Sequence, residues 1–182
     1  PLRNPRRRPR RGGAVTNVAS RGNDGRQCIV PRCTRATAAP SKVIAVARSW
    51  LGTPYHDQAS LRGVGCDCLG LARGVWREVV GPEPFPIPAY SRDWGETGPR
   101  EVLAEGAGRM MPEISVSEVC PGALVLFRMR PCAIAKHVGI MTGPDHFIHA
   151  YERLGVIEEA LTRSWRRRIA LAFLFPRITD GG

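Results

Sequence analysis

No stretch of the 182 residues approaches the roughly 18 consecutive apolar residues that a membrane-spanning helix needs, so we expect no insertion into a membrane. The sequence has only 6 cysteines, and their uneven spacing does not suggest a disulfide framework, which favours a reducing compartment. The opening begins at Pro1 and lacks an apolar segment followed by a small-residue cleavage site, so we expect no secretory signal. The length suits one globular domain with a tail.

Acidic residues are nearly absent from positions 1–40, where ten arginines are accompanied by Asp24 alone. This segment therefore carries a charge of +9, whereas residues 41–182, with 17 basic and 15 acidic side chains, carry only +2. Segment 1–40 also has no aromatic residue, so it cannot bury enough surface to offset the entropy of ordering it. We interpret it as a disordered Arg-rich leader. Three interpretations of this segment remain open. It is an arm that binds phosphates or another anionic polymer, a solvated tail without a partner, or sequence translated from a start placed too early.

From residue 41 onward the apolar residues become periodic. They predict one helix that begins at Ser41 and ends before Gly52, and a short one over 99–109. Between them, Asp67 is a good N-cap for a helix that ends before Gly81. This middle helix has one apolar stripe, which consists of Cys68, Leu71, Ala72, Val75, Trp76 and Val79.

The second half of the domain alternates with a period of two and predicts five strands. These strands cover residues 123–129, 137–141, 146–151, 155–159 and 168–175. Helices that come first and consecutive short strands that follow indicate an α+β domain, in which a helical layer packs on an antiparallel sheet.

Cys68 is the candidate nucleophile because the spacing places it in the first turn of the middle helix. Unpaired N–H groups and the positive end of the helix dipole lower the pKa of a thiol at such a position. An ordinary buried cysteine fits the same pattern, so the local sequence leaves both readings open. Cys66 lies in the preceding loop and off the apolar stripe.

A cysteine nucleophile needs a base and a group that orients the base. If strands 137–141 and 146–151 form a hairpin with an even register, His137 and His149 share one face of the sheet. His149 then holds the imidazole of His137 while His137 takes the thiol proton, and Gly139 leaves room for a substrate. Two unrelated histidines of the sheet are the simpler alternative. His146 and His56 receive no catalytic role.

Several short motifs follow one another along the chain. They are Tyr55, Gly-Cys-Asp-Cys-Leu-Gly-Leu at 65–71, Pro-Gly-Ala-Leu-Val-Leu-Phe at 121–127, Lys-His-Val-Gly-Ile at 136–140 and Phe-Ile-His-Ala at 147–150. In combination they resemble the NlpC family of papain-like cell-wall cysteine peptidases. Leu-Gly-Thr-Pro-Tyr at 51–55 and Trp-Arg-Arg-Arg at 165–168 resemble the phage-type branch, which is found with tail modules and gene transfer agents. The resemblance covers residues 41 to about 176.

The resemblance implies a papain-like domain in which Cys68 is the nucleophile, His137 the base and His149 the third polar catalytic residue. It assigns Tyr55 and Asp67 to substrate binding. Backbone N–H groups at the start of the Cys68 helix would complete the stabilisation of the oxyanion. The usual serine after the cysteine is here Leu69, a change that bears on substrate recognition and leaves the nucleophile in place.

The implied reaction is hydrolysis of an amide bond in the peptide stems of peptidoglycan, usually between D-glutamate and a diamino acid, without a metal or an organic cofactor. The phage-type branch implies an enzyme made in the cytoplasm and carried in a phage or gene transfer agent particle. Its partners there would be tail or baseplate hub proteins, and it would act on the cell wall in the periplasm.

Three alternatives remain open. The first is a metal site built from Cys66, Cys68, His137 and His149, although Cys-x-Cys with histidines 12 apart matches no common zinc spacing. The second is a catalytically inactive structural tail-tip protein with the same fold. The third is a nucleic-acid-binding protein, for which only residues 1–40 argue.

Overall fold

A computed structural model describes residues 37–87, 89, 90 and 100–177, so the disordered leader predicted for residues 1–40 falls almost entirely outside the described residues. The helices are α1 (Pro40–Arg48), α2 (Cys68–Val79), α3 (Val102–Gly108) and the short α4 (Arg163–Arg166), with a 3-10 turn η1 (Val116–Glu118). The strands are β1 (Ser60–Leu61), β2 (Gly65–Cys66), β3 (Glu113–Ile114), β4 (Ala123–Phe127), β5 (His137–Met141), β6 (His146–Tyr151), β7 (Gly155–Ala160) and β8 (Ile169–Leu174). None of the described helices is both long enough and apolar enough to cross a membrane.

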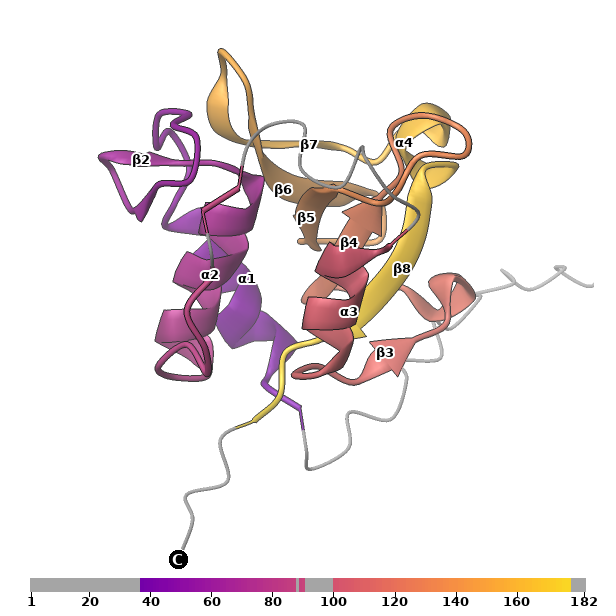
Figure 1. The fold of residues 1–182 in the computed structure, drawn as a ribbon, viewed down its shortest axis with the longest axis horizontal. Coiled ribbons are helices and arrows are strands. Elements are labelled where there is room, and N and C mark those ends of the chain that lie inside the picture. Colours follow the sequence, from indigo (N-terminus) through magenta and orange to yellow (C-terminus); the bar gives the residue numbers. More distant parts are fainter. Residues whose placement is uncertain (1–36, 88, 91–99, 178–182) are drawn as a thin grey trace, which may run out of the picture.

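Six strands form one antiparallel sheet in the order β3-β8-β4-β5-β6-β7. Helices α1, α2 and α3 share one hydrophobic core with one face of this sheet, and Figure 1 shows α1 beside α2. A second, smaller core lies on the opposite face, where Trp165 of α4 packs against Phe127 and Phe147. The α+β fold with a helical layer on an antiparallel sheet is therefore confirmed.

The predicted helices and strands are all present, and most of their ends lie within two residues of the expected positions. The first helix begins slightly earlier than expected: its N-cap is Ala39, Pro40 is in the first turn, and Ser41 lies inside the helix. Proline fits there because its missing N–H needs no partner in the first turn. The chain is already paired before this helix, since Thr37 bridges to Pro176 and the backbone N–H of Ala38 donates to the carbonyl of Phe175.

The β5–β6 hairpin has the even register that the sequence predicted. Ile140 pairs with Ile148 and Met141 pairs with Phe147, which places Gly139 opposite His149. His137 and His149 therefore lie on the same face of the sheet, one step apart along a diagonal. Their face is the one that carries the smaller core, whereas α2 packs on the other face.

Candidate active site

The start of α2 is fixed by Asp67, which is buried with 4% of its surface exposed. Its Oδ1 accepts a hydrogen bond of 2.6 Å from the N–H of Gly70, and its Oδ2 accepts one of 2.8 Å from the N–H of Gln58. The hydroxyl of Tyr90 donates a third hydrogen bond, of 2.5 Å, to Oδ2. The N-cap role of Asp67 is thus confirmed, and its carboxylate fixes the first turn of the helix.

Gly70 allows this first turn to approach the preceding loop closely. A Cβ at this position would lie 1.8 Å from the backbone carbonyl oxygen of Ala59, a distance that no side chain tolerates. The Ser60 hydroxyl also donates a 2.5 Å hydrogen bond to the carbonyl of Gly70. Packing therefore requires the glycine of the Asp-Cys-Leu-Gly motif. The close contact fixes the first turn of α2 against the preceding loop.

Cys68 lies beside the first residue of β5, so the helix start and the hairpin meet at its sulfur. The thiol donates a weak hydrogen bond to the carbonyl of Lys136, with 3.9 Å between the two heavy atoms, and the N–H of Val138 donates to the sulfur. These two contacts lie on either side of His137 in the sequence. The nucleophile and the base predicted from sequence are thus brought to the same place.

Burial, together with the negative charge of Asp67, raises the pKa of the Cys68 thiol to about 12. The backbone N–H groups of Cys68, Leu69 and Val138 lower it, which is the effect that the sequence predicted for a helix start. The prediction of a lowered pKa was nevertheless wrong, because desolvation outweighs these hydrogen bonds. Cys68 is therefore a neutral thiol at pH 7.

His137 and His149 form a directly bonded pair, with 2.8 Å between Nε2 of His137 and Nδ1 of His149. His149 has no exposed surface. Burial lowers the pKa of His137 to about 3, with a contribution from His149, and lowers the pKa of His149 to about 4. Both rings are therefore neutral at pH 7, so each has one ring nitrogen without a proton.

Aromatic rings enclose the histidine pair. The ring of Trp165 stacks on His137 at 5.8 Å between centroids and meets His149 edge-on at 5.3 Å. The space beside Gly139, which we expected a substrate to occupy, is filled, because a Cβ there would lie 2.8 Å from Phe147 and 3.0 Å from Phe127. This expectation was wrong, and Gly139 instead lets these two rings pack close to the β5 backbone.

Cys68 and His137 line one cavity of about 390 Å³. The other residues that line it are Tyr55, Ala150, Tyr151, Glu152 and Arg153. The Tyr55 hydroxyl donates a 3.1 Å hydrogen bond to Oδ1 of Asp57, and burial raises the pKa of this phenol. Of the two residues predicted to bind substrate, Tyr55 lines this cavity and Asp67 does not.

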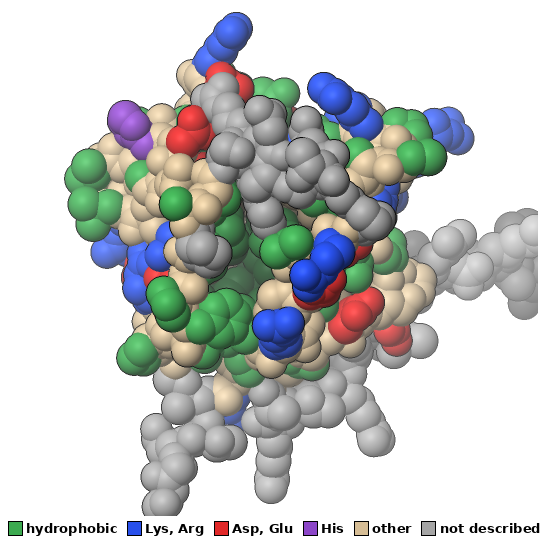
Figure 2. Space-filling model, viewed as in Figure 1, with side chains coloured by type: hydrophobic (Ala, Val, Ile, Leu, Met, Phe, Trp, Pro, Cys, Tyr) green, Lys and Arg blue, Asp and Glu red, His purple; other side chains and the backbone are tan. Residues whose placement is uncertain are grey.

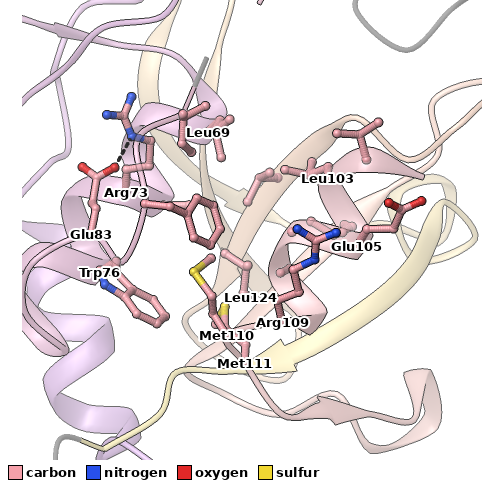
Figure 3. Close-up of a pocket in the computed structure, with 18 of the residues that line it drawn as sticks. Leu69, Arg73, Trp76, Glu83, Leu103, Glu105, Arg109, Met110, Met111 and Leu124 are labelled. Atoms are coloured by element: carbon pink, nitrogen blue, oxygen red, sulfur yellow. Dashed lines mark hydrogen bonds and ion pairs between the residues drawn. The ribbon is translucent and has the colours of Figure 1, made fainter. Parts of the chain in front are cut away.

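A larger cavity of about 620 Å³ lies between α2 and α3 and has mostly apolar walls. Figure 2 shows hydrophobic side chains gathered around this hollow. In Figure 3, Leu69 and Trp76 of α2 lie across from Leu103, Met110 and Met111. Leu69, at the position where the family resemblance led us to expect a serine, therefore belongs to an apolar wall, and Cys68 next to it lines the smaller cavity.

Cys66 is not part of the cavity that Cys68 and His137 share. It has no exposed surface, it lies in β2, and it packs in the core that the helices share with the sheet. Among the residues that the structure describes, no group of three or more histidine, cysteine, aspartate or glutamate side chains is arranged to hold a metal ion. The geometry gives no support to the alternative of a Cys66–Cys68–His137–His149 metal site.

Comparison with known proteins relates the chain to one family. The family model described as the NlpC/P60 family matches residues 52–173. Of curated proteins of Escherichia coli K12, "Murein DD-endopeptidase MepS/Murein LD-carboxypeptidase" is 29% identical over 129 residues, which are 70% of this chain and 58% of that protein. "Probable endopeptidase NlpC" is 28% identical over 114 residues, which are 63% of each chain. This chain thus matches only about three fifths of the length of these relatives.

The fold also matches solved structures. The crystal structure of the NlpC/p60 domain of the peptidoglycan hydrolase SagA superimposes with a TM-score of 0.54 at 23% identity, covering 74% of this chain and 97% of that domain. An NlpC/P60 family protein from Bacillus cereus gives a TM-score of 0.55, also at 23% identity, and the match covers 75% of this chain and 40% of that one. At these identities the likeness concerns the fold.

Proposed function

The chain belongs to the NlpC/P60 family, and on this basis we propose that it is a cysteine peptidase that hydrolyses amide bonds in the peptide stems of peptidoglycan. One observation carries the proposal: Cys68, at the start of a helix, and His137, which is bonded to His149, line the same cavity. The names of the relatives, a murein endopeptidase and a peptidoglycan hydrolase, support this class of substrate.

The reaction begins from a neutral thiol and a neutral imidazole. His137 accepts the thiol proton as the sulfur attacks the carbonyl carbon of the scissile amide, so that the positive charge on the imidazolium forms beside the developing negative charge. The imidazolium then donates its proton to the leaving amine, and water releases the acyl group from the sulfur. Backbone N–H groups at the start of α2 stabilise the oxyanion, together with the hydroxyl of Tyr55.

We place Asp67 in a positioning role, in contrast to the substrate contact that the family resemblance implied. Its carboxylate is buried and accepts hydrogen bonds from two backbone N–H groups and one hydroxyl, so it orients the helix that carries Cys68. Substrate contacts fall instead to residues around the mouth of the cavity, namely Tyr55, Tyr151, Glu152 and Arg153.

The bond proposed for cleavage is the amide between D-glutamate and a diamino acid. A peptide stem carries free carboxylates and amines around this bond, and the β6–β7 turn presents one acidic and one basic side chain, Glu152 and Arg153, at the cavity. Such groups fit a charged peptide, since a guanidinium binds a carboxylate through two parallel hydrogen bonds. The family resemblance supports the choice of this particular bond.

We further propose that the enzyme is made in the cytoplasm, is borne on a phage or gene transfer agent tail, and opens the cell wall locally from the periplasm. The motifs at 51–55 and 165–168 support this role. Detection of the chain in purified particles by mass spectrometry, with tail or baseplate proteins as neighbours after crosslinking, tests it. Recovery of the chain only outside such particles would contradict it.

Incubation of the protein with purified peptidoglycan, followed by mass spectrometry of the released fragments, tests the activity and identifies the bond. We expect stem peptides that end in D-glutamate. Cys68→Ala should abolish their release, and Cys66→Ala, a buried cysteine two residues away, should retain most of it. Equal loss from both variants would argue against a nucleophilic role specific to Cys68. Absence of release by the folded wild-type protein would favour the alternative of a structural tail-tip protein.

A further inference from the structure

The histidine pair continues into a third polar side chain that the mechanism above does not use. In the β6–β7 ladder, Phe147 pairs with Glu159 and His149 pairs with Ile157, so Glu159 lies on the same face as His149, one step along the diagonal. His137 stands in the same diagonal relation to His149 across β5 and β6. Three neighbouring strands thus place His137, His149 and Glu159 in one row.

The contact at the end of this row involves the buried nitrogen of His149. Its Nε2 lies 2.8 Å from Oε1 of Glu159, at hydrogen-bonding distance. His149 has no exposed surface, and its Nε2 makes no well-formed hydrogen bond with any described residue, Glu159 included. A buried N–H is costly to leave unpaired, so the Glu159 carboxylate is the group that can satisfy it.

Trp165 holds the carboxylate in place. Burial raises the pKa of Glu159 above its ordinary value, and a hydrogen bond from the side chain of Trp165 offsets part of this rise. The Trp165 ring also packs on both His137 and His149. Glu159, whose side chain is 35% exposed, lies beside the histidine pair and Trp165 of α4. Its neighbour Glu158 points to the other face and pairs with Arg48 of α1 at 2.8 Å.

We propose that Glu159 is a positioning residue that acts through His149 and fixes the proton on the correct nitrogen of His137. The proposal rests on the proposed peptidase function and adds a residue to it. An acceptor at Nε2 of His149 keeps the proton there, so Nδ1 of His149 has a free lone pair. That lone pair accepts the Nε2–H of His137, which leaves Nδ1 of His137 unprotonated and able to take the thiol proton.

Without the acceptor, the opposite arrangement becomes accessible. His149 can then carry its proton on Nδ1 and donate it to Nε2 of His137, which puts the proton of His137 on Nδ1. In that tautomer the nitrogen available to Cys68 is already protonated and cannot act as the base. Loss of Glu159 should thus reduce the fraction of molecules in the active tautomer while substrate binding stays as it was.

The test compares Glu159→Leu with Glu159→Gln and uses Glu158→Leu as the matched control on the same strand. Glutamine offers an amide oxygen to Nε2 of His149, whereas leucine offers no acceptor. We expect Glu159→Leu to lower kcat for peptidoglycan stem peptides by about ten- to a hundredfold with KM unchanged, as for other partners that orient a functional histidine. Glu159→Gln should recover most of kcat, and Glu158→Leu should match the wild type.

A spectroscopic readout separates this role from a structural one. Nitrogen-15 NMR of the histidine rings should show the proton on Nε2 of both His137 and His149 in the wild type and in Glu159→Gln, and a shift toward the Nδ1–H form in Glu159→Leu. A wild-type His149 protonated on Nδ1, or a slowed Glu159→Leu with unchanged tautomers, would overturn the proposal. This readout needs no substrate, so it decides about Glu159 even if the peptidase proposal fails.

Discussion

Replacing Asp67 by asparagine should lower the stability of the fold and the pKa of the nucleophile together. The Asp67 carboxylate is acceptor-only and receives the N–H of Gly70, the N–H of Gln58 and the hydroxyl of Tyr90. An asparagine has one oxygen, so its amide N–H₂ must face one of the two backbone donors. The hydroxyl of Tyr90 can turn and accept, but the N–H of Gln58 cannot.

The expected loss follows from these contacts. One unsatisfied backbone N–H in a partly buried place costs about 1–3 kcal/mol, and the remaining hydrogen bonds lose the strength that the charge gave them. We therefore expect Asp67→Asn to lower the free energy of unfolding by about 2–3 kcal/mol in urea denaturation. The control is Asp145→Asn, because the Asp145 side chain is 72% exposed and its ion pair with Arg166 should contribute less than about 1 kcal/mol.

The same substitution should make the thiol more acidic, because the negative charge of Asp67 raises the pKa of Cys68. The rate of alkylation of Cys68 by iodoacetamide, followed as a function of pH, should rise at a lower pH in Asp67→Asn than in the wild type. Unchanged stability, or an alkylation profile displaced to higher pH, would refute this account of Asp67.

Three other perturbations test separate parts of the structure. Gly70→Ala should lower the free energy of unfolding by about 3 kcal/mol or more in urea denaturation, because its Cβ would lie 1.8 Å from a backbone oxygen. Gly106→Ala, whose Cβ would lie in open space within α3, should raise the free energy of unfolding by about 0.5–1 kcal/mol. Leu69→Ser should lower the free energy of unfolding by about 1–3 kcal/mol, because an apolar side chain is lost, and it should still release peptides. Complete loss of peptide release would contradict the place of Leu69 in the apolar wall. Burial lowers the pKa values of His137 and His149 to about 3 and about 4, so below about pH 6.5 the unfolded chain binds more protons than the folded chain. The free energy of unfolding should therefore fall from pH 6.5 toward pH 4, by up to about 1.4 kcal/mol per pH unit for each ring. An equal free energy of unfolding at pH 7 and pH 5 would contradict this burial.

Features that depend on local sequence could be predicted. The N-cap at Asp67 and the stripe of α2 follow from helical spacing, and they place Cys68 at a helix start. The β5–β6 hairpin joins strands that are consecutive in the sequence, so alternation alone put His137 and His149 on one face. These local features made Cys68, His137 and His149 candidates, and the family resemblance was needed to choose them over the simpler alternatives.

Features that depend on packing between distant segments could not be predicted. Glu158 and Glu159 are consecutive in β7 and point to opposite faces of the sheet. Only the pairing of β7 with β6 determines that Glu159 lies on the face of the histidines. The rings that fill the space beside Gly139 come from two different strands. The raised pKa of Cys68 likewise reflects burial under the assembled sheet and helix, which outweighs the helix start that the sequence shows.

The central claim is that the sulfur of Cys68 forms a covalent acyl intermediate with a peptide stem, with His137 as the base. The most direct measurement is rapid acid quenching of the protein with purified stem peptides, followed by peptide mapping by mass spectrometry. We predict an acyl adduct on Cys68 in the wild type, a much slower appearance of this adduct in His137→Ala, and none in Cys68→Ala. Peptide release that persists in Cys68→Ala, or an adduct confined to another residue, would contradict the account.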